Sequence, residues 1–325
     1  MFCVSCDIFA KLNIFLQKQI FLEYFCSHSE YFFYFRELKR TNMTTREAIM
    51  LLRHELGATY DSREIEGMTR IIFEEVLLWQ PIDIVMRDNE QLPDFFDNRL
   101  ASIIERLKRH EPLQYILGKA RFHGHNFAVT PAVLIPRPET EQLVDIIIDE
   151  NPSSDLQVLD IGTGSGCIAI SLARALKFAQ VTATDISHDA LQVAQQNAIA
   201  LKTRVRFLEQ DILTCRAPSE MWDIIVSNPP YITEQEKATM ERNVLDYEPH
   251  SALFVPNNDP MLFYRPIATY ASRALKNGGR LYLEINRTMA QLVCDTLSKS
   301  GLSNIQIYND FNGNNRFITA TKINS

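Results

Sequence analysis

The stretch Gln157-Val-Leu-Asp-Ile-Gly-Thr-Gly-Ser-Gly166 decides the fold expected for this chain. Its first five residues form a short apolar run, which is typical of a buried strand in a parallel sheet. The glycines that follow permit a tight turn, where backbone N–H groups and a helix N-terminus can approach a ligand closely. We therefore expect a strand, a ligand-binding turn and a helix in succession over residues 157–176.

Strand and helix patterns alternate along the rest of the chain. The expected strands cover residues 157–161, 180–185, 205–208, 223–226, 280–285, 304–308 and 316–321. Helices are expected over residues 167–176, after Ser187, from Asp259 to a cap at Asn277-Gly278-Gly279, and before Gly301. Such alternation specifies an α/β fold with a doubly wound sheet and right-handed crossovers.

Three acidic residues, Asp160, Asp185 and Asp211, lie at the ends of successive strand regions. Carboxylates in these places can hold a cationic amino group, two ribose hydroxyls and the edge of an adenine. The glycines are spaced one residue short of the dinucleotide fingerprint G-x-G-x-x-G, which argues against NAD. We therefore expect S-adenosylmethionine in a Rossmann-like domain. Cys167 has no basic partner nearby in sequence and is interpreted as a packing residue.

A second motif, Ser227-Asn228-Pro229-Pro230-Tyr231-Ile232, follows the strand expected at 223–226. Two prolines end the strand, so the carbonyls of Asn228 and Pro229 lack ladder partners at the sheet edge where α/β folds bind ligands. The Asn228 side chain adds an acceptor and a donor, and Tyr231 adds a flat ring. These groups can hold a planar NH2 group. The alternative is a simple turn, since Asn-Pro is common at turns.

Length and composition are those of a globular protein of about two domains. The chain has 325 residues, 46% of them hydrophobic and 22% charged, and a net charge of −7. Such an acidic chain is not expected to bind nucleic acid directly. The six cysteines show no disulfide-framework spacing, which favours a reducing, cytoplasmic location. Cys3-x-x-Cys6 lacks a second pair at zinc spacing, so no metal is expected.

The first 42 residues differ from the rest of the chain. They are crowded with aromatic side chains, and charges interrupt every apolar run long enough to span a membrane. They also lack the basic start and clean apolar core of a signal peptide. A helix at a membrane surface is one alternative. Our hypothesis is that translation starts at Met43 and that residues 1–42 are an atypical, non-native extension, which the intact mass of the naturally expressed protein would test.

The remaining residues divide into three parts. Residues 43–112 predict a helical domain for substrate recognition, with capping patterns at Thr44-x-x-Glu47 and Asp61-x-x-Glu64 and a further helix at 94–109. Residues 113–135 predict a linker with a β-hairpin, whose turn places Gly124 between two surface histidines.

Residues 136–325 form the α/β domain, which begins near a proline-rich segment. Pro138 can open a helix there. Arg137, beside the prolines, is either a functional residue or one half of an ion pair at the helix start.

From Thr44 onward the chain resembles the peptide chain release factor N5-glutamine methyltransferases, the HemK/PrmC family. The segments that carry this resemblance are Pro112–Gly118, Leu134–Glu141, Asp160–Gly166, Asn228–Ile232 and Tyr247–Leu253. The Asn-Pro-Pro-Tyr motif alone is shared with methyltransferases of DNA adenine and RNA guanine. Its combination with the arginine-proline-glutamate segment is far more specific.

The resemblance implies methyl transfer from S-adenosylmethionine to the side-chain amide of the glutamine in the Gly-Gly-Gln motif of translation release factors. The implied partner is a release factor, and we expect a monomer without membrane association. Alternatives are a ribosomal-protein glutamine methyltransferase, a nucleic-acid methyltransferase acting on the exocyclic amine of adenine or guanine, and a non-catalytic binding module. The acidic net charge argues against the nucleic-acid alternative.

The expected site residues combine the motifs with this resemblance. The cofactor-binding residues are Asp160, Gly162, Thr163, Gly164, Ser165, Gly166, Asp185, Asp211, Ile212 and Asn228. The catalytic residues are Asn228, Pro229 and Tyr231, and the substrate-binding residues are these three with Pro230, Arg137 and Glu139. The chain departs from the family pattern at Asn286, where glycine is usual, and at Asn315, where aspartate usually precedes an arginine.

Overall fold

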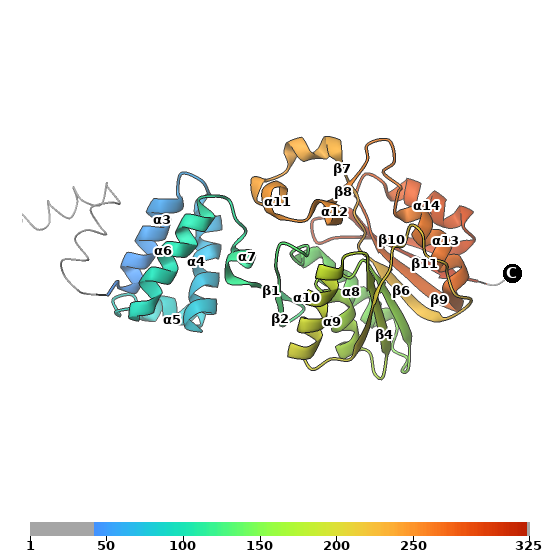
Figure 1. Cartoon of the computed structure of the whole chain (residues 1–325), viewed down its shortest axis with the longest axis horizontal. Coiled ribbons are helices and arrows are strands. Elements are labelled where there is room, and N and C mark those ends of the chain that lie inside the picture. The colour runs from blue at the N-terminus through green and yellow to red at the C-terminus, as the bar shows by residue number, and fades with distance from the viewer. Residues whose placement is uncertain (1–41, 324–325) are drawn as a thin grey trace, which may run out of the picture. The chain divides into compact units, whose positions relative to one another are not determined.

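The computed structural model describes residues 42–323 and divides into two compact units, with the division between Arg109 and His110 (Figure 1). Apart from Asn42, the extension expected over residues 1–42 lies outside the described residues. No helix among residues 42–323 is long and apolar enough to cross a membrane.

The first unit is helical, and two of its helices begin where the sequence places polar caps. It contains α3 (Thr45–Leu56), α4 (Ser62–Leu77), α5 (Pro81–Met86) and α6 (Asp94–Leu107). The capping box at the start of α3 is confirmed, because Thr44 N–H donates to Glu47 Oε2 at 2.8 Å and Glu47 N–H donates to Thr44 Oγ1 at 3.3 Å. Asp61 caps α4 by accepting from the backbone N–H of Glu64 at 2.8 Å.

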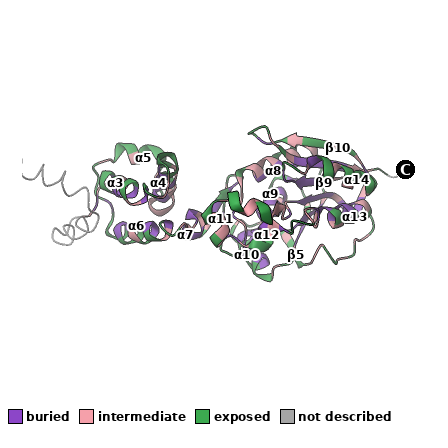
Figure 2. Ribbon diagram, turned by 90° about the horizontal axis from the view of Figure 1, so that it is seen from above, coloured by how far each residue is buried: buried purple, intermediate pink, exposed green. Residues whose placement is uncertain are grey.

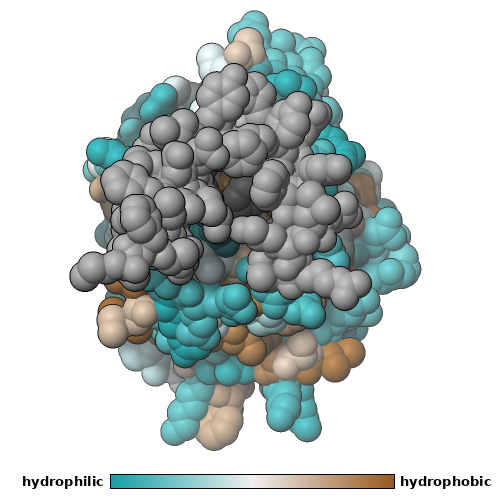
Figure 3. All heavy atoms as spheres, turned by 90° about the vertical axis from the view of Figure 1, so that its left-hand side faces the viewer, coloured by the Kyte–Doolittle hydropathy of each residue, from teal (hydrophilic) through white to brown (hydrophobic). Residues whose placement is uncertain are grey.

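Helix α5 was not expected from the sequence. Its apolar side chains are largely outside the core, since Ile82, Val85 and Met86 are 63%, 70% and 77% exposed. Figure 2 accordingly draws α5 mostly in the colour of exposed residues. The face drawn in Figure 3 likewise shows apolar patches among hydrophilic surface. A six-residue helix without a buried stripe gives no amphipathic period to detect.

The second unit is built on a seven-stranded sheet of order β10-β11-β9-β6-β3-β4-β5. Strand β11 pairs antiparallel with both of its neighbours, and the remaining pairs are parallel. Its elements are α7 (Leu113–Leu117), β1 (Lys119–Phe122), β2 (His125–Ala128), α8 (Pro138–Glu150), β3 (Gln157–Ile161), α9 (Cys167–Ala175), β4 (Gln180–Asp185), α10 (His188–Ala200), β5 (Val205–Glu209), β6 (Trp222–Ser227), β7 (Ile232–Thr233), the 3-10 helix η1 (Glu234–Thr239), α11 (Arg242–Tyr247), α12 (His250–Leu253), β8 (Phe254–Val255), α13 (Tyr264–Ala274), β9 (Leu275–Glu284), α14 (Ala290–Lys299), β10 (Leu302–Asn309) and β11 (Asn315–Lys322).

Helices cover both faces of this sheet, as a doubly wound fold requires (Figure 1). Val158 and Ile224 pack on the face covered by α8 and α9. Leu159 and Ile225, the next residues along the same strands, pack on the face covered by α13 and α14. Because successive strand residues point to opposite faces and helices cover both faces, the residues on both faces must be apolar. The apolar run at residues 157–161 thus places β3 at the centre of the fold.

The start of β9 differs from the sequence expectation. The helix expected from Asp259 to Asn277 begins at Tyr264 and ends at Ala274, and β9 starts at Leu275. The expected cap is instead a strand segment, beside a register shift between β6 and β9. A Cβ on Gly279 would lie 3.0 Å from the carbonyl oxygen of Trp222, so this glycine permits the close approach of the two strands.

The segment expected as a linker packs within the second unit. The predicted hairpin is confirmed as β1 and β2, and its turn residues His123 and Gly124 have φ values of +46° and +76°. Tyr115 and Val133 pack against Val193 of α10. The Tyr115 hydroxyl also donates to the carbonyl oxygen of Val133 at 2.6 Å.

Candidate active site

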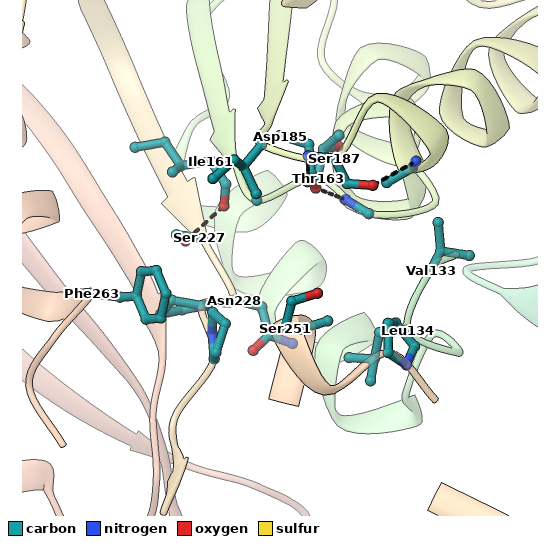
Figure 4. Close-up of a pocket in the computed structure, with 18 of the residues that line it drawn as sticks. Val133, Leu134, Ile161, Thr163, Asp185, Ser187, Ser227, Asn228, Ser251 and Phe263 are labelled. Carbon is teal, nitrogen blue, oxygen red and sulfur yellow. Dashed lines mark hydrogen bonds between the residues drawn. The ribbon is translucent and has the colours of Figure 1, made fainter. Parts of the chain in front are cut away.

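A cavity of about 340 Å³ lies at the carboxyl ends of β3, β4 and β6. The predicted cofactor residues that line it are Gly162, Thr163, Gly164, Ser165, Asp185, Asp211, Ile212 and Asn228. Figure 4 shows Thr163, Asp185 and Ser187 at the top of the cavity, Asn228, Ser251 and Phe263 below them, and Val133 and Leu134 at the right-hand side. The switch point expected from the strand order therefore holds a cavity of ligand size.

The glycine-rich turn forms one wall of this cavity and is fixed by backbone hydrogen bonds. The N–H groups of Gly162 and Thr163 both donate to the carbonyl oxygen of Thr184, at 2.8 and 2.9 Å. Gly162, Gly164 and Gly166 all have positive φ values, which glycine adopts at little cost. The turn ends at Gly166, which caps α9.

Asp185 is held at the cavity by two backbone N–H groups. Its Oδ2 accepts from Gly164 and its Oδ1 accepts from Ser187, both at 2.9 Å. Burial raises the pKa of this carboxyl, and the N–H groups oppose that shift. Each carboxylate oxygen still has a second lone pair, so Asp185 can accept from two neighbouring hydroxyls.

Asp160 does not reach the cavity. It is fully buried below the turn, where its Oδ2 accepts from the Thr163 hydroxyl at 2.6 Å and its Oδ1 has no hydrogen-bond partner. Burial raises the pKa of Asp160 to about 7. The geometry therefore favours support of the turn through Thr163 over direct contact with a bound amino group.

Asp211 makes a local turn, with its Oδ1 accepting from the N–H of Leu213 at 2.8 Å.

Sequence reasoning missed the apolar part of the lining of the first cavity. Ile186 and Leu213 line the cavity and are 63% and 42% exposed, which is unusual for large apolar side chains. Ile186 directly follows Asp185, the last residue of β4, and Leu213 lies two residues after Asp211. Their nearness to predicted cofactor-binding acids was the only sequence feature that could have indicated their role. They can cover the faces of an aromatic base.

A second cavity, of about 290 Å³, adjoins the first. The residues that line both are Leu134, Arg137, Asn228, Pro229 and Ala252. Tyr231 and Glu284 line only the second cavity, and Pro230 lines only the first. Asn228 and Pro229 therefore belong to the wall that the two cavities share, and a group passing from a ligand in one cavity to a ligand in the other would pass beside them.

Arg137 is held by an acid far along the chain. Its Nη2 donates to Glu248 Oε1 at 2.6 Å, so the ion pair does not use the acids of the adjacent helix start. Arg137 remains 33% exposed and borders both cavities, so the structure supports a structural contact and leaves its surface available to a ligand. Glu139 lines neither cavity.

Tyr231 is fixed at both its ring and its backbone. Its hydroxyl donates to Glu284 Oε1 at 3.2 Å, and its carbonyl oxygen accepts from Asn286 Nδ2 at 3.3 Å. Burial and the nearby carboxylate of Glu284 raise the pKa of Tyr231, so the phenol stays neutral. Asn286 also donates to Glu236 Oε1 at 3.1 Å and therefore ties the end of β9 to η1.

The two departures from the family pattern thus have structural counterparts. Asn286 does not adopt a positive φ, and its side chain makes the contacts just described. Arg316, which follows Asn315, takes its acid partner from elsewhere, because its Nε donates to Asp310 Oδ2 at 3.2 Å.

Cys167 and His123 show no catalytic arrangement in the part of the chain that the structure describes. Burial raises the pKa of the Cys167 thiol to about 12, which agrees with its interpretation as a packing residue. His123 contacts Asp145 on the hairpin surface. Within residues 42–323, no three His, Cys, Asp or Glu side chains are grouped as a metal site.

Comparison with known proteins places both units in families. Residues 139–246 match the methyltransferase small domain, and residues 47–118 match the PrmC N-terminal domain. A methyltransferase of known structure from Pyrococcus furiosus is similar over 70% of this chain and 100% of that chain, with 19% identity and a TM-score of 0.47.

Two relatives are similar over most of their length. One, named release factor glutamine methyltransferase, is from Bacteroides thetaiotaomicron; it is 44% identical over 272 residues, which are 83% of this chain and 98% of the relative. The other, with the same name, is from Flavobacterium psychrophilum; it is 43% identical over 267 residues, which are 81% and 94% of the two chains.

The fold, the cavity at its switch point and the matched domain define an S-adenosylmethionine-dependent methyltransferase. The expected fold class, with a helical domain before the α/β domain, is confirmed. The chain belongs to the family of release factor glutamine methyltransferases, as the resemblance predicted.

Proposed function

We propose that this protein methylates the side-chain amide nitrogen of the glutamine in the Gly-Gly-Gln motif of a translation release factor. The observation that carries the proposal is the wall formed by Asn228 and Pro229 between the two cavities. A donor in the first cavity and an amide in the second would meet at this wall. The names of the relatives support the same substrate.

The first cavity fits S-adenosylmethionine in size and chemistry. Its volume of about 340 Å³ lies in the range of cofactor sites, and the acids Asp185 and Asp211 suit a ribose and the edge of an adenine. When bound, this cofactor supplies an electrophilic methyl group: the nitrogen–carbon bond forms as the sulfur–carbon bond breaks, and that electron pair stays on sulfur. The exposed Ile186 and Leu213 would cover the adenine.

The second cavity would position the glutamine amide. An amide nitrogen is a weak nucleophile because its lone pair is delocalised into the carbonyl. The Asn228 side-chain oxygen and the Pro229 carbonyl oxygen would accept its two N–H bonds and aim the nitrogen toward the first cavity. Positioning of this kind contributes about 7–11 kcal/mol in favourable cases.

The same two acceptors would also favour the transition state over the ground state. Their hydrogen bonds strengthen as the nitrogen becomes positive. The nitrogen then loses one proton to solvent, so neutral amide is restored in the product. No strong base is needed, in keeping with the buried, protonated state of the Cys167 thiol.

The remaining expectations complete this proposal. The helical unit, expected over residues 43–112, would recognise the release factor, and residues 136–325 would carry the chemistry. We expect a cytoplasmic location, since release factors act at ribosomes. We also expect a monomer.

Methyl transfer from labelled S-adenosylmethionine to purified release factor tests the proposal. Label should reach the wild-type factor and not its Gln→Ala variant at the Gly-Gly-Gln motif. Asn228→Ala should abolish transfer and weaken cofactor binding without removing it. Wild-type rates in Asn228→Ala would refute the role of this wall. Label on neither factor, with cofactor still bound, would refute the substrate and move the search to ribosomal protein and nucleic acid.

A further inference from the structure

Three polar side chains from distant parts of the second unit form one hydrogen-bonded line at the wall: Thr140 borders the first cavity, Asn228 borders both cavities, and Glu284 borders the second. Asn228 Nδ2 donates to Thr140 Oγ1 at 3.3 Å, and the Thr140 hydroxyl donates to Glu284 Oε2 at 2.7 Å. Glu284 also accepts from Tyr231 through Oε1. Among the hydrogen bonds of the described residues, none uses Asn228 Oδ1. That atom is therefore available to a ligand.

The direction of these bonds follows from chemistry. An ionised carboxylate only accepts, so Glu284 requires the Thr140 hydroxyl to donate to it. A hydroxyl has one hydrogen, so the Thr140 oxygen can only accept from Asn228. The atom of Asn228 that faces Thr140 must then be its NH2 group. This argument fixes the orientation of the amide without relying on how its nitrogen and oxygen were assigned.

The position of the line depends on the fold. Thr140 lies in the first turn of α8, which begins at Pro138, and its side chain is 3% exposed. Glu284 is the last residue of β9 and is 2% exposed. Burying a carboxylate is costly unless hydrogen bonds or charges compensate it. The Glu284 carboxylate is therefore unfavourable to bury, and the side chains that donate hydrogen bonds to it are Thr140 and Tyr231.

We propose that Thr140 and Glu284 are positioning residues that hold the Asn228 amide with its oxygen toward the substrate. The inference rests on the proposed function and deepens it. Without the line, the Asn228 amide could turn, and its NH2 group would then face the N–H bonds of the substrate. Two donors would oppose each other at the point where the substrate nitrogen must be aimed.

Thr140→Val and Thr140→Ser test this positioning. The valine variant keeps the shape of the side chain and removes the hydroxyl, whereas the serine variant keeps the hydroxyl. We expect Thr140→Val to lower kcat for release factor methylation roughly ten- to hundredfold, with KM for the factor changed far less. Thr140→Ser should stay within a few-fold of wild type.

Thr296→Val serves as the control. Thr296 is another helical threonine of the second unit, its hydroxyl donates to the carbonyl oxygen of Leu292 at 2.8 Å, and it lines neither cavity. Its replacement should leave kcat unchanged. Equal loss in Thr296→Val and Thr140→Val would mean a general effect of removing a helical hydroxyl and would overturn the inference.

A second readout does not depend on turnover. In asparagine-selectively 15N-labelled protein, the Asn228 side-chain NH2 resonance can be assigned by its loss in Asn228→Ala. We expect this resonance to shift in Thr140→Val and to be retained in Thr140→Ser. An unchanged resonance together with wild-type kcat in Thr140→Val would refute the inference while leaving the proposed function intact. Wild-type enzyme that transfers no methyl group would refute both.

Discussion

The guanidinium of Arg137 donates to the carboxylate of Glu248 at 2.6 Å, across 111 residues of sequence. The second oxygen of Glu248 accepts from the N–H of Ile135 at 3.2 Å. One buried carboxylate thus fixes the segment that borders both cavities. Breaking this contact would leave a buried N–H group and a partly exposed cation without their partner.

We expect Glu248→Ala to lower the free energy of unfolding of the second unit by about 2–4 kcal/mol. The chain has two tryptophans, Trp79 in the first unit and Trp222 in the second. In a Trp79→Phe background, denaturant unfolding followed by fluorescence reports on the second unit alone. Asp246→Ala, which removes an exposed ion pair with Arg242, should lower the free energy of unfolding far less. Equal losses in the two variants would contradict this assignment.

The rate of methyl transfer should fall at acid pH because of Glu284. Burial raises the pKa of this carboxyl, hydrogen bonds from Thr140 and Tyr231 and the charge of Arg316 lower it, and Glu139 raises it further. Below the resulting raised pKa, Glu284 carries a proton and can donate to Thr140, which releases Asn228. The measurement is kcat against pH at saturating cofactor. Glu284→Gln should show low kcat throughout and no acid limb of this origin, and an identical acid limb would contradict the prediction.

Reversing the direction of the hydrogen-bond line should restore part of the activity. Glu284→Gln introduces an NH2 group that donates to Thr140, and Asn228→Asp introduces a carboxylate that accepts from it. Asn228→Asp alone leaves two carboxylates competing for the one hydrogen of the Thr140 hydroxyl, whereas the double variant reverses both bonds and keeps an acceptor toward the substrate. We expect kcat of the double variant to exceed that of Asn228→Asp by about tenfold. A double variant no better than Asn228→Asp would argue against a shared line.

Gly166 and Gly301 allow backbone strain to be separated from packing at the cofactor turn. Their φ values are +81° and +84°, so alanine costs about 1 kcal/mol at either for the left-handed backbone. A Cβ at Gly166 would also lie 3.0 Å from Ile170 Cδ1 and 3.1 Å from Ala194 Cβ, and a Cβ at Gly301 meets nothing within 4 Å. Gly166→Ala should therefore lower the free energy of unfolding by about 1–3 kcal/mol more than Gly301→Ala does.

Cofactor affinity distinguishes the same two glycine variants. Isothermal titration with S-adenosylmethionine should show weaker binding in Gly166→Ala and unchanged binding in Gly301→Ala. The turn lines the first cavity, whereas Gly301 lies after α14 and outside it. Unchanged binding in both variants would place the cofactor elsewhere.

Much of the fold could be predicted from local patterns in the sequence. The apolar run of β3, the positive-φ glycines after it and the cap at Thr44 each depend on neighbouring residues, and each was predicted. Helix α5 was missed because six residues with no buried side chain show no period. The two glycines within β9, Gly278 and Gly279, were interpreted as a helix cap, since a register shift between two strands leaves no mark in the local sequence.

The site was predictable where a motif and a strand end coincide, as at Asp185 and Asn228. Both faces of β3 are covered by helices, so its residues do not alternate between apolar and polar. For that reason the sequence did not reveal that Asp160 points below the turn. The contact between Thr140 and Glu284 joins residues 144 apart, and the packing of α8 against β9 brings them together.

The antiparallel position of β11 also determines when the site can form during synthesis. Every residue that lines the two cavities precedes residue 285 in the chain. Yet β11 pairs along β9 up to Glu284, and Arg316 donates to the Tyr231 hydroxyl at 3.5 Å. A nascent chain therefore contains all of the lining before it contains the strand that supports it. Competence for methyl transfer should appear only after β11 has been synthesised and has inserted between β9 and β10.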